Sequence, residues 1–508
     1  MKRKRIGLLT AYPEGIYAKR IMEGVFAQCC AYDYDVFVFT PLVQVVHYFR
    51  DYLNGELNIF RLMNFDQIDG LIVDTSTLTE DHIPWVAEML LKQIKESCDK
   101  PVVSVDLAFG DYPVVNTDDI LTMSEITAHV LDHHGCRDIY YLSGYYGHEV
   151  AEERLRGFTQ ELEKRNIPVE QDKIFYGDFW YTGGETLADR IISGELKLPE
   201  AIICASDHLA IGLANRLMKH GIKIPEQVIV TGHDATAEAM LNHLTITTHV
   251  PETSRSSAEA VNRIRAILEP EKEILPPAEP ELHGLITGES CGCGTNTACL
   301  HEILSTALVH NYQNLTNSDN QDQVDLGRLN ISYMFESITE KPSVHEALYG
   351  IMYNSYLLRP YRNFWLCLRD DWLDTAHTYK EGYPEIMRNV LHAVPQNSVL
   401  AGQTQHCGDS PMYNFNTKDL IPEFPENRET PSVFYFTPVH FQDNMLGYAV
   451  LECDLAQKHT IGSVYHLWLR NVSNALEMKR LHERGERAAQ ELARAQERPA
   501  QTENAENA

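Results

Sequence analysis

The stretch AIICASDHLAIGLANRLMKHGIKIPEQVIVTGHD, residues 201–234, has the pattern of a strand, a helix and a second strand. Residues 201–205 and 228–231 are short runs rich in apolar side chains, and residues 208–220 repeat apolar side chains at helical spacing. Both short runs are apolar almost throughout, which is typical of strands buried on both faces of a sheet. The stretch therefore predicts a β-α-β unit with parallel strands.

The same alternation extends from residue 5 to about residue 290. Further strands are predicted at residues 5–11, 35–39, 70–74, 102–106, 139–142 and 282–287. Further helices are predicted at residues 16–32, 83–97, 124–134, 149–165 and 252–268. This order predicts a doubly wound α/β architecture, and its length predicts two lobes. Ligands of such open sheets bind at the carboxyl ends of the strands.

The pattern changes after about residue 330 and predicts a smaller α+β part. Its predicted elements are a helix at 344–356, a strand at 363–368, a hairpin of strands at 432–440 and 445–453, and a helix at 461–494. A loop-rich segment covers residues 395–431, and another helical pattern covers residues 301–315.

The composition limits the possible functions. The 508-residue chain has a net charge of −29, which opposes nucleic-acid binding by the protein as a whole. Its 11 cysteines are few for its length and odd in number, which favours reduced thiols and a cytoplasmic location. The basic segment Lys2–Arg5 precedes too few apolar residues for a signal peptide, and no apolar run is long enough to span a membrane. We interpret this segment as a solvated lead-in to the first strand, with DNA contact as the alternative.

Several stretches together resemble one protein family. They are RIGLLTAYPEGIYAKRIMEGVFAQCCAYDYDVFVF, VVNTDDILTMSEITAHVLDHHGCRDIYYLSG, AEERLRGF, YGDFWYTGGETLAD, the stretch 201–234 and LTITTHVP. In this order they resemble the effector-binding domain of the lactose/galactose-repressor (LacI/GalR) family, which shares its fold with periplasmic sugar-binding proteins. The resemblance implies two Rossmann-like lobes with a small ligand in the cleft between them.

The resemblance also implies a set of ligand-binding residues. These are Tyr12, Arg154 in RLRGF, Phe179 and Trp180 after the Gly-Asp pair, Asp207 after the predicted strand at 201–205, and Asp234 in GHD. Arginine donates a fork of hydrogen bonds to hydroxyls, carboxylates accept from them, and a flat ring covers the apolar face of a sugar.

Each of these assignments has an alternative. Arg154 and Asp234 are also suited to form a structural ion pair with each other. Phe179 and Trp180 are also suited to packing within a lobe, Tyr12 to the surface, and Asp207 to capping the helix at 208–220.

Repressors of this family carry a helix-turn-helix headpiece before the first strand. In this sequence the first strand pattern begins at residue 6, so we expect no such DNA-reading fold before it. The segment FYFTPVHFQDNMLGYAVLECD and the helix after it resemble a GAF-type sensory domain. The whole order resembles bacterial sensors that end in a GGDEF domain, which is not found in this sequence.

These patterns predict five parts. They are a LacI/GalR-like ligand-binding domain of two Rossmann-like lobes at 1–290, a linker and helix at 291–325, a GAF-like domain at 326–460, a long helix at 461–495 and a disordered tail at 496–508. The long helix is open to two interpretations: an amphipathic terminal helix, or a parallel dimer helix, which a weak heptad seam indicates. The positions of this seam are Leu467, Asn471, Asn474, Met478, Leu481, Gly485, Ala488 and Leu492.

No catalytic motif is evident, and we expect neither enzymatic activity nor a cofactor. Cys291, Cys293, Cys299 and His301 are types that bind zinc, but C-x-C is tighter than the usual knuckle, so we expect a domain junction and no metal. His133 and His134 are interpreted as the end of a helix. The sequence thus predicts a cytoplasmic, homodimeric sensor of a small polar metabolite, with a sugar as the expected ligand. The alternative is a LacI-family transcriptional regulator that acts on DNA through a partner or its basic N-terminus.

Overall fold

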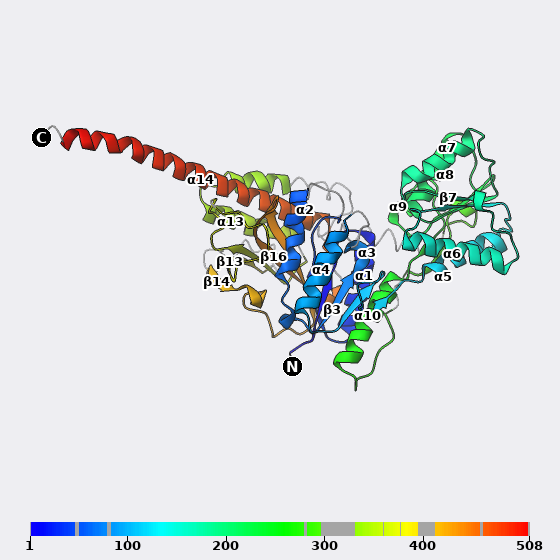
Figure 1. Cartoon of the computed structure of the whole chain (residues 1–508), viewed down its shortest axis with the longest axis horizontal. Coiled ribbons are helices and arrows are strands. Elements are labelled where there is room, and N and C mark those ends of the chain that lie inside the picture. Colours follow the sequence, from blue (N-terminus) through cyan, green and yellow to red (C-terminus); the bar gives the residue numbers. More distant parts are fainter. Residues whose placement is uncertain are drawn as a thin grey trace, which may run out of the picture. The chain divides into compact units, whose positions relative to one another are not determined.

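The computed structural model divides the chain into two compact units (Figure 1). Unit 1 contains Met1–Val115, Ser257–Pro277 and His310–Ala508, and unit 2 contains Asn116–Ser256 and Ala278–Val309. The structure describes residues 2–45, 50–78, 83–278, 282–295, 331–358, 360–375, 377–394, 412–457 and 461–505, with side chains up to residue 494.

Among the described residues, unit 1 is built on a ten-stranded sheet with the order β14-β13-β12-β16-β15-β2-β1-β3-β4-β5. Its strands are β1 (Arg5–Leu9), β2 (Asp35–Phe39), β3 (Gly70–Asp74), β4 (Val102–Val105), β5 (Val114–Val115), β12 (Asn363–Arg369), β13 (Ile386–Ala393), β14 (Tyr413–Asn416), β15 (Ser432–Phe441) and β16 (Asn444–Asp454). The N-terminal strands are parallel and the C-terminal strands antiparallel. The two groups meet where β15 runs parallel to β2.

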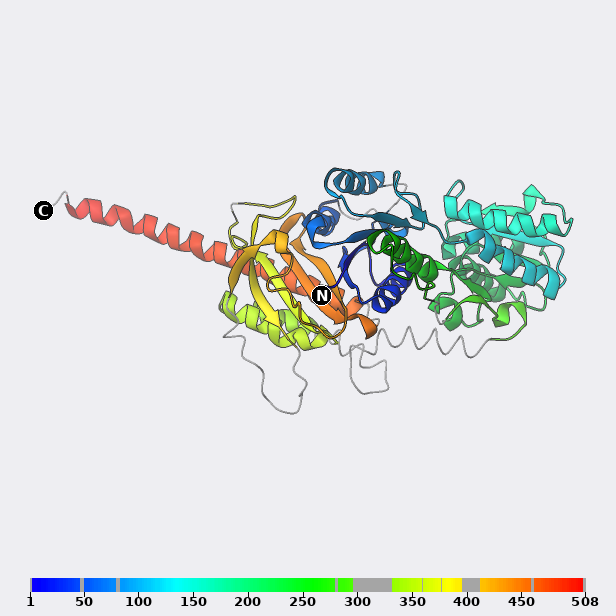
Figure 2. The same cartoon turned by 90° about the horizontal axis from the view of Figure 1, so that it is seen from below.

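Both faces of this sheet are covered, because side chains alternate along its strands. In β2, Val36 and Val38 belong to one apolar cluster, whereas Phe37 and Phe39 belong to another. The first cluster includes side chains of α1 (Ile16–Ala31), α10 (Thr253–Leu268), α13 (Val344–Tyr353) and α14 (Ser463–Ala505). The second includes side chains of α2 (Arg50–Leu57), α3 (Thr75–Leu78) and α4 (Pro84–Ser97). Figure 2 shows these helices from a second direction.

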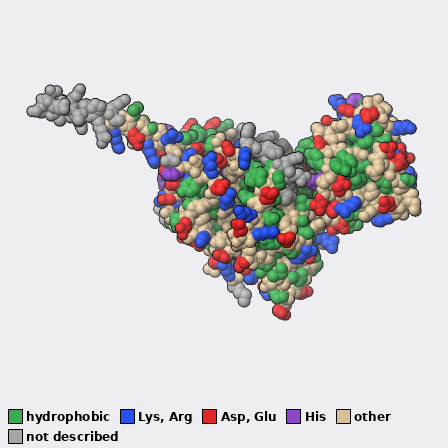
Figure 3. Space-filling view, in the orientation of Figure 1, with side chains coloured by type: hydrophobic (Ala, Val, Ile, Leu, Met, Phe, Trp, Pro, Cys, Tyr) green, Lys and Arg blue, Asp and Glu red, His purple; other side chains and the backbone are tan. Residues whose placement is uncertain are grey.

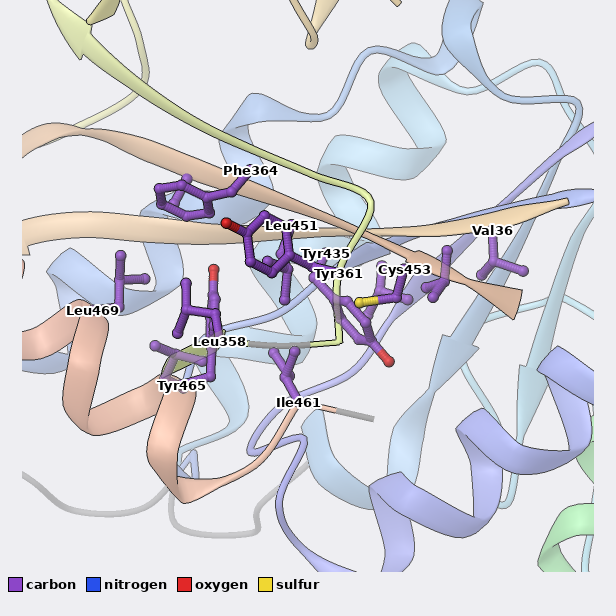
Figure 4. Close-up of a cluster of buried hydrophobic side chains, with 14 of the residues drawn as sticks. Val36, Leu358, Tyr361, Phe364, Tyr435, Leu451, Cys453, Ile461, Tyr465 and Leu469 are labelled. Carbon is purple, nitrogen blue, oxygen red and sulfur yellow. The ribbon is translucent and has the colours of Figure 1, made fainter. Parts of the chain in front are cut away.

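The first cluster joins distant parts of the sequence. Val36 of β2 and Tyr435 of β15 share it with Cys453 of β16 and with Tyr465 and Leu469 of α14 (Figure 4). Each of these side chains is almost fully buried. The N-terminal strands and the C-terminal part of unit 1 therefore share one core.

A buried ion pair supports the junction of β2 and β15. Arg428 donates to both carboxylate oxygens of Asp35, at 3.0 and 2.5 Å, and the backbone N–H of Ser432 donates to the same carboxylate at 2.9 Å. Asp35 is 1% exposed. The carboxylate thus fixes the segment that leads into β15 beside the start of β2.

The basic segment is not the solvated lead-in that the sequence suggested. Arg3 forms an ion pair with Asp33 at 2.7 Å, and Lys4 forms one with Asp69 at 2.9 Å. Arg5 is the first residue of β1 and is 3% exposed. Carboxylates of neighbouring segments in unit 1 therefore hold these three side chains.

Unit 2 contains a four-stranded parallel sheet with the order β7-β6-β8-β9. Its strands are β6 (Ile139–Ser143), β7 (Ile174–Tyr176), β8 (Ala201–Cys204) and β9 (Ile229–Thr231), and a small separate sheet pairs β10 (Thr248–Val250) with β11 (Gly284–Ile286). Its helices are α5 (Asp119–Ala128), the π-helix η3 (His129–His133), α6 (Glu149–Lys164), α7 (Tyr181–Ile192), α8 (Asp207–Lys219) and α9 (Ala237–Leu241).

Most predicted elements are confirmed within a few residues. The predicted helix at 124–134 begins earlier, because Asp118 caps α5 by accepting from the N–H of Leu121. Helix α14 continues to Ala505, through much of the predicted disordered tail, since Ala, Glu, Gln and Arg favour helix. The predicted helix at 301–315 lies outside the described residues. The five-part division stays a prediction, and the sheet of unit 1 takes strands from two of those parts.

None of the described helices has both the length and the hydropathy that a membrane span requires.

We predict that Arg428→Ala strongly destabilises unit 1, because it leaves Asp35 buried without its partner. The free energy of unfolding should fall by about 3–5 kcal/mol in urea denaturation followed by circular dichroism. Lys95→Ala, which removes an exposed ion pair with Asp111, is the control and should change it by less than about 0.5 kcal/mol. Equal effects of the two variants would contradict the structural role of the Asp35–Arg428 pair.

Candidate functional site

Polar and aromatic side chains gather where the strands of unit 2 end. Tyr145 follows β6, Phe179 follows β7, Asp207 follows β8 and Asp234 follows β9. All four strands are parallel, so their carboxyl ends lie along one edge of the sheet. Ligands of open α/β sheets bind at this edge. We call these segments the carboxyl edge of unit 2.

Arg154 on α6 is at the centre of a buried ionic cluster at this edge. Its Nε donates to Asp119 at 2.7 Å, one terminal nitrogen donates to the carbonyl oxygen of Ala205 at 2.6 Å, and the other is 3.1 Å from Asp234. Arg154 is 2% exposed and Asp234 is 5% exposed. The ion pair that was the alternative for Arg154 and Asp234 is thus present, and it belongs to a larger network.

His233 extends this cluster as a neutral side chain. Burial, and then the positive charge of Arg154, lower the pKa of His233 to about 4. Its Nδ1 lies 3.0 Å from Asp234, and its Nε2 lies 2.9 Å from the hydroxyl of Thr122. Because the carboxylate accepts, Nδ1 donates to Asp234 and Nε2 accepts from Thr122. His233 therefore fixes the orientation of the Asp234 carboxylate.

Asp207 is a second buried carboxyl group at this edge. It accepts from the backbone N–H of Thr236 at 2.7 Å and from the hydroxyl of Thr236 at 3.0 Å. Burial, and then the charge of Asp234, raise the pKa of Asp207 to about 8. Its alternative role as a helix cap is wrong, because Ser206 caps α8 by accepting from the N–H of Leu209. Asp207 is instead the first residue of that helix.

Aromatic rings lie beside this cluster. Phe179 has a left-handed backbone (φ 60°), and its carbonyl oxygen accepts from the hydroxyl of Ser206 at 2.8 Å. Its ring packs edge-on against Tyr145. Trp180 is 55% exposed and its ring centroid lies 4.4 Å from that of His208. Phe179 is thus partly used in packing, whereas Trp180 is more than half exposed.

Tyr12 lies in unit 1, at the carboxyl end of β1, and is partly buried. It has a left-handed backbone (φ 51°), and its carbonyl oxygen accepts from the N–H of Gly15 at 2.8 Å. Close to it in the sheet, Asp74 at the end of β3 accepts from Thr10 at 2.6 Å and from Ser76 at 2.6 Å. Burial raises the pKa of Asp74.

Four polar residues at these strand ends were missed in the sequence analysis: Asp74, Asp119, His208 and His233. Asp74 ends an apolar strand and His233 directly precedes the predicted Asp234. The sequence therefore placed both residues at the end of a predicted strand, where ligands of such sheets bind. Asp119 gives no such signal, because it meets Arg154 only when α5 packs on α6. The ligand-binding roles of the six predicted residues stay predictions.

Pockets are present elsewhere among the described residues. One, in unit 1, is lined by Leu42, Tyr52, Glu56, Pro438, His440, Phe441, Gln442, His466, Leu469, Arg470, Ser473 and Asn474. In it, Glu56 accepts from the N–H of Leu42 at 2.7 Å and lies 3.1 Å from the ring of His440. Another lies in unit 2 beside α7 and includes Asp178 and Arg190.

We predict that Arg154→Met destabilises unit 2, because the carboxylates of Asp119 and Asp234 then remain buried without their counterion. The loss should be about 3–5 kcal/mol in urea denaturation. Arg156→Ala on the same helix removes an exposed pair with Glu153 and should change stability by less than about 0.5 kcal/mol. An Arg154→Met protein as stable as the Arg156→Ala protein would contradict the cluster.

We predict that Asp207 makes stability fall as the pH rises. Between about pH 4 and about pH 8 the folded protein keeps a proton on Asp207 that the unfolded chain has released, so raising the pH favours unfolding. His233 acts in the opposite sense, but only below its ordinary pKa of 6.5. Between pH 6.5 and 8, the wild type should therefore lose stability by up to about 1.4 kcal/mol per pH unit relative to Asp207→Asn. Asp189→Asn, at an exposed ion pair, should follow the wild type, and parallel curves for all three proteins would disprove the assignment.

A family model supports the architecture of this region. Residues 128–291 match the model of a periplasmic binding protein-like domain. They include most of the carboxyl edge and of the ionic cluster, with Asp119 just outside.

Curated relatives match a larger part of the chain. A protein named HTH-type transcriptional repressor PurR from Vibrio parahaemolyticus is 29% identical over 236 residues, which are 46% of this chain and 64% of that protein. A protein of the same name from Actinobacillus pleuropneumoniae is 25% identical over 285 residues, 55% of this chain and 78% of that protein. This chain thus spans less than two thirds of the length of the first of these relatives.

Among solved structures, the transcription regulator CcpA of Lactococcus lactis is 20% identical and covers 57% of this chain and 99% of its own, with a TM-score of 0.43. The family model covers the region that contains Arg154, His233 and Asp234 of the ionic cluster. Residues 128–291 of this chain are thus similar to a periplasmic binding protein-like domain, and the longer match is to proteins named as transcriptional repressors.

Proposed function

We propose that this protein is an effector-responsive regulator of the LacI/GalR type and that a small polar metabolite binds at the carboxyl edge of unit 2. The observation that carries the proposal is the buried cluster of Arg154, Asp119, Asp234 and His233 at that edge. The relatives that match this region are named transcriptional repressors, which supports a role in regulation.

The chemistry of the edge favours a hydroxyl-rich ligand of the sugar class. Arg154 is held by three partners, so its orientation is fixed before a ligand arrives. The pKa of Asp207 is raised to about 8, so its carboxyl group offers a donor near neutral pH, and the carboxyl group of Asp234, which is paired with Arg154, offers an acceptor to neighbouring hydroxyls. The exposed ring of Trp180 provides a surface for the apolar face of a sugar ring.

We further propose that DNA contact does not use the basic segment. Arg3, Lys4 and Arg5 are held within unit 1 by Asp33, Asp69 and other partners. On the face that Figure 3 shows, Lys and Arg side chains are interspersed with Asp and Glu and do not form a single basic patch. We therefore propose that any DNA contact of this protein uses residues other than Arg3, Lys4 and Arg5, or another subunit.

A second candidate function, a sensor that relays its signal through the C-terminal part, is favoured by the pairing of β15 with β2. That pairing places β15, from the segment 326–460 that we propose to be GAF-like, in one sheet with the N-terminal strands. We propose that α14 then joins two copies, because its heptad positions Leu467, Met478, Leu481 and Leu492 are 37–62% exposed. In both candidates the ligand binds at the same edge.

We predict that a panel of sugars and sugar derivatives contains a compound that raises the melting temperature of this protein. Trp180→Ala should weaken binding of that compound by roughly 3- to 10-fold, because a ring contact is lost while the fold is kept. Titration calorimetry measures the affinity, and Trp85→Ala on α4 of unit 1 serves as the control with unchanged affinity. An equal loss in both variants, or a panel without any stabilising compound, would refute the ligand site.

A mobility-shift experiment on the promoter next to the coding sequence distinguishes the two candidates. Specific binding that responds to the stabilising compound supports the transcriptional regulator. Its absence, together with dimerisation that is lost on removal of residues 461–508 and seen by light scattering, supports the signal-relaying sensor.

A further inference from the structure

Two histidines and two cysteines of unit 2 meet at one point, away from the ionic cluster. His129 is the first residue of the π-helix η3, and His134 follows that helix directly. Cys291 ends the short 3-10 helix η5 (Glu289–Cys291), and Cys293 lies two residues further on. One ligand atom from each of these residues lies within 4.8 Å of those from the other three.

Four of the six distances between these ligand atoms are close to those between the ligands of a tetrahedral metal ion. The Nε2 atoms of His129 and His134 are 3.2 Å apart, and the sulfur of Cys293 is 3.4 Å from His134 and 3.7 Å from His129. The sulfur of Cys291 is 3.6 Å from His129. Bonds of about 2.3 Å to sulfur and about 2.0–2.1 Å to nitrogen place tetrahedral ligands about 3.3–3.8 Å apart.

The backbone on the histidine side is unusual in a way that serves this geometry. In an α-helix, residues five apart point in clearly different directions, whereas the wider π-helical turn brings His129 and His134 to the same side. The ring of His133 stacks on that of His129, with centroids 5.1 Å apart and an interplanar angle of 12°. Such single π-turns occur frequently at functional sites.

The cysteine side is shaped by a glycine. Gly292 lies between the two cysteines with a left-handed backbone (φ 87°), and a side chain there would also press on Pro225 at 3.1 Å. Cys291 is 2% exposed, whereas Cys293 is exposed. The turn therefore directs both sulfurs toward the histidines. Because Cys293 is exposed, a metal ion can reach the site from solvent on that side.

From this arrangement we infer that His129, His134, Cys291 and Cys293 bind one Zn²⁺ ion. Two thiolates and two imidazoles are a ligand set typical of structural zinc, and four protein ligands leave no open position for catalysis. The ion would fix the segment after β11 to the end of α5, about 160 residues away in sequence. This site differs from the sequence-based candidate, since it replaces Cys299 and His301 with His129 and His134.

The experiment measures metal in the full chain, purified with a reductant and without chelators. Plasma mass spectrometry should find about one zinc per chain. Replacement with Co²⁺ should give the visible absorption of tetrahedral cobalt and a thiolate charge-transfer band. Cys293→Ser and His134→Asn should each lower the zinc affinity at least about tenfold in a competition with a chromogenic chelator.

Control variants separate this site from other thiols and imidazoles. Cys98→Ser and His220→Asn, away from the cluster, should keep the zinc content and the cobalt spectrum of the wild type. Cys299→Ser should keep them as well, and loss of the metal in that variant would transfer the site to the sequence-based set.

The melting temperature tests whether the zinc ion stabilises the fold. Removing zinc with a chelator should lower the melting temperature of the wild type and leave that of Cys293→Ser unchanged, because that variant has already lost the ion. Background zinc content in the reduced wild type after reconstitution, or an unchanged cobalt spectrum in both Cys293→Ser and His134→Asn, would overturn the inference.

Discussion

The parallel pairing of β15 with β2 is the contact on which unit 1 depends. It joins residues about 400 positions apart in register, so that Val433 faces Val36 and Phe436 faces Phe39. The alternation of side chains in both strands then supplies apolar residues to both faces of the sheet. Because Asp35 is buried at this junction, the pairing also requires Arg428 as its counterion.

Unit 2 concentrates buried charge at the end of its sheet where ligands of this architecture bind. Asp119 and Asp234 share Arg154, while Asp207 beside them is held in its protonated form. Keeping these groups away from water costs free energy, and the cost is offset only while the network is complete. The proposed recognition of a polar ligand would give such a buried polar cluster a role beyond stability.

Local patterns were sufficient for most elements but not for all. Strands β1 to β4, β6, β8 and β9 are short apolar runs, so they were predicted from sequence. Strand β7 is only three residues long, and β13 contains Arg388, Asn389 and His392. Neither strand therefore shows a clear apolar run or a clear alternation of apolar and polar side chains. Of the site, Arg154, Asp207 and Asp234 were found from the resemblance, whereas the contact of Asp119 with Arg154 depends on helix packing.

The sequence by itself determined where most of the longer strands and helices form in the first 290 residues, because that information lies in neighbouring side chains and in helical or alternating periods. The tertiary structure decided which distant segments meet. The spacing of apolar side chains along the sequence does not indicate that β15 pairs with β2. It also does not indicate that the histidines after α5 lie close to Cys291 and Cys293. Such contacts follow from how complete elements pack, since two residues far apart in sequence are brought together only by the fold as a whole.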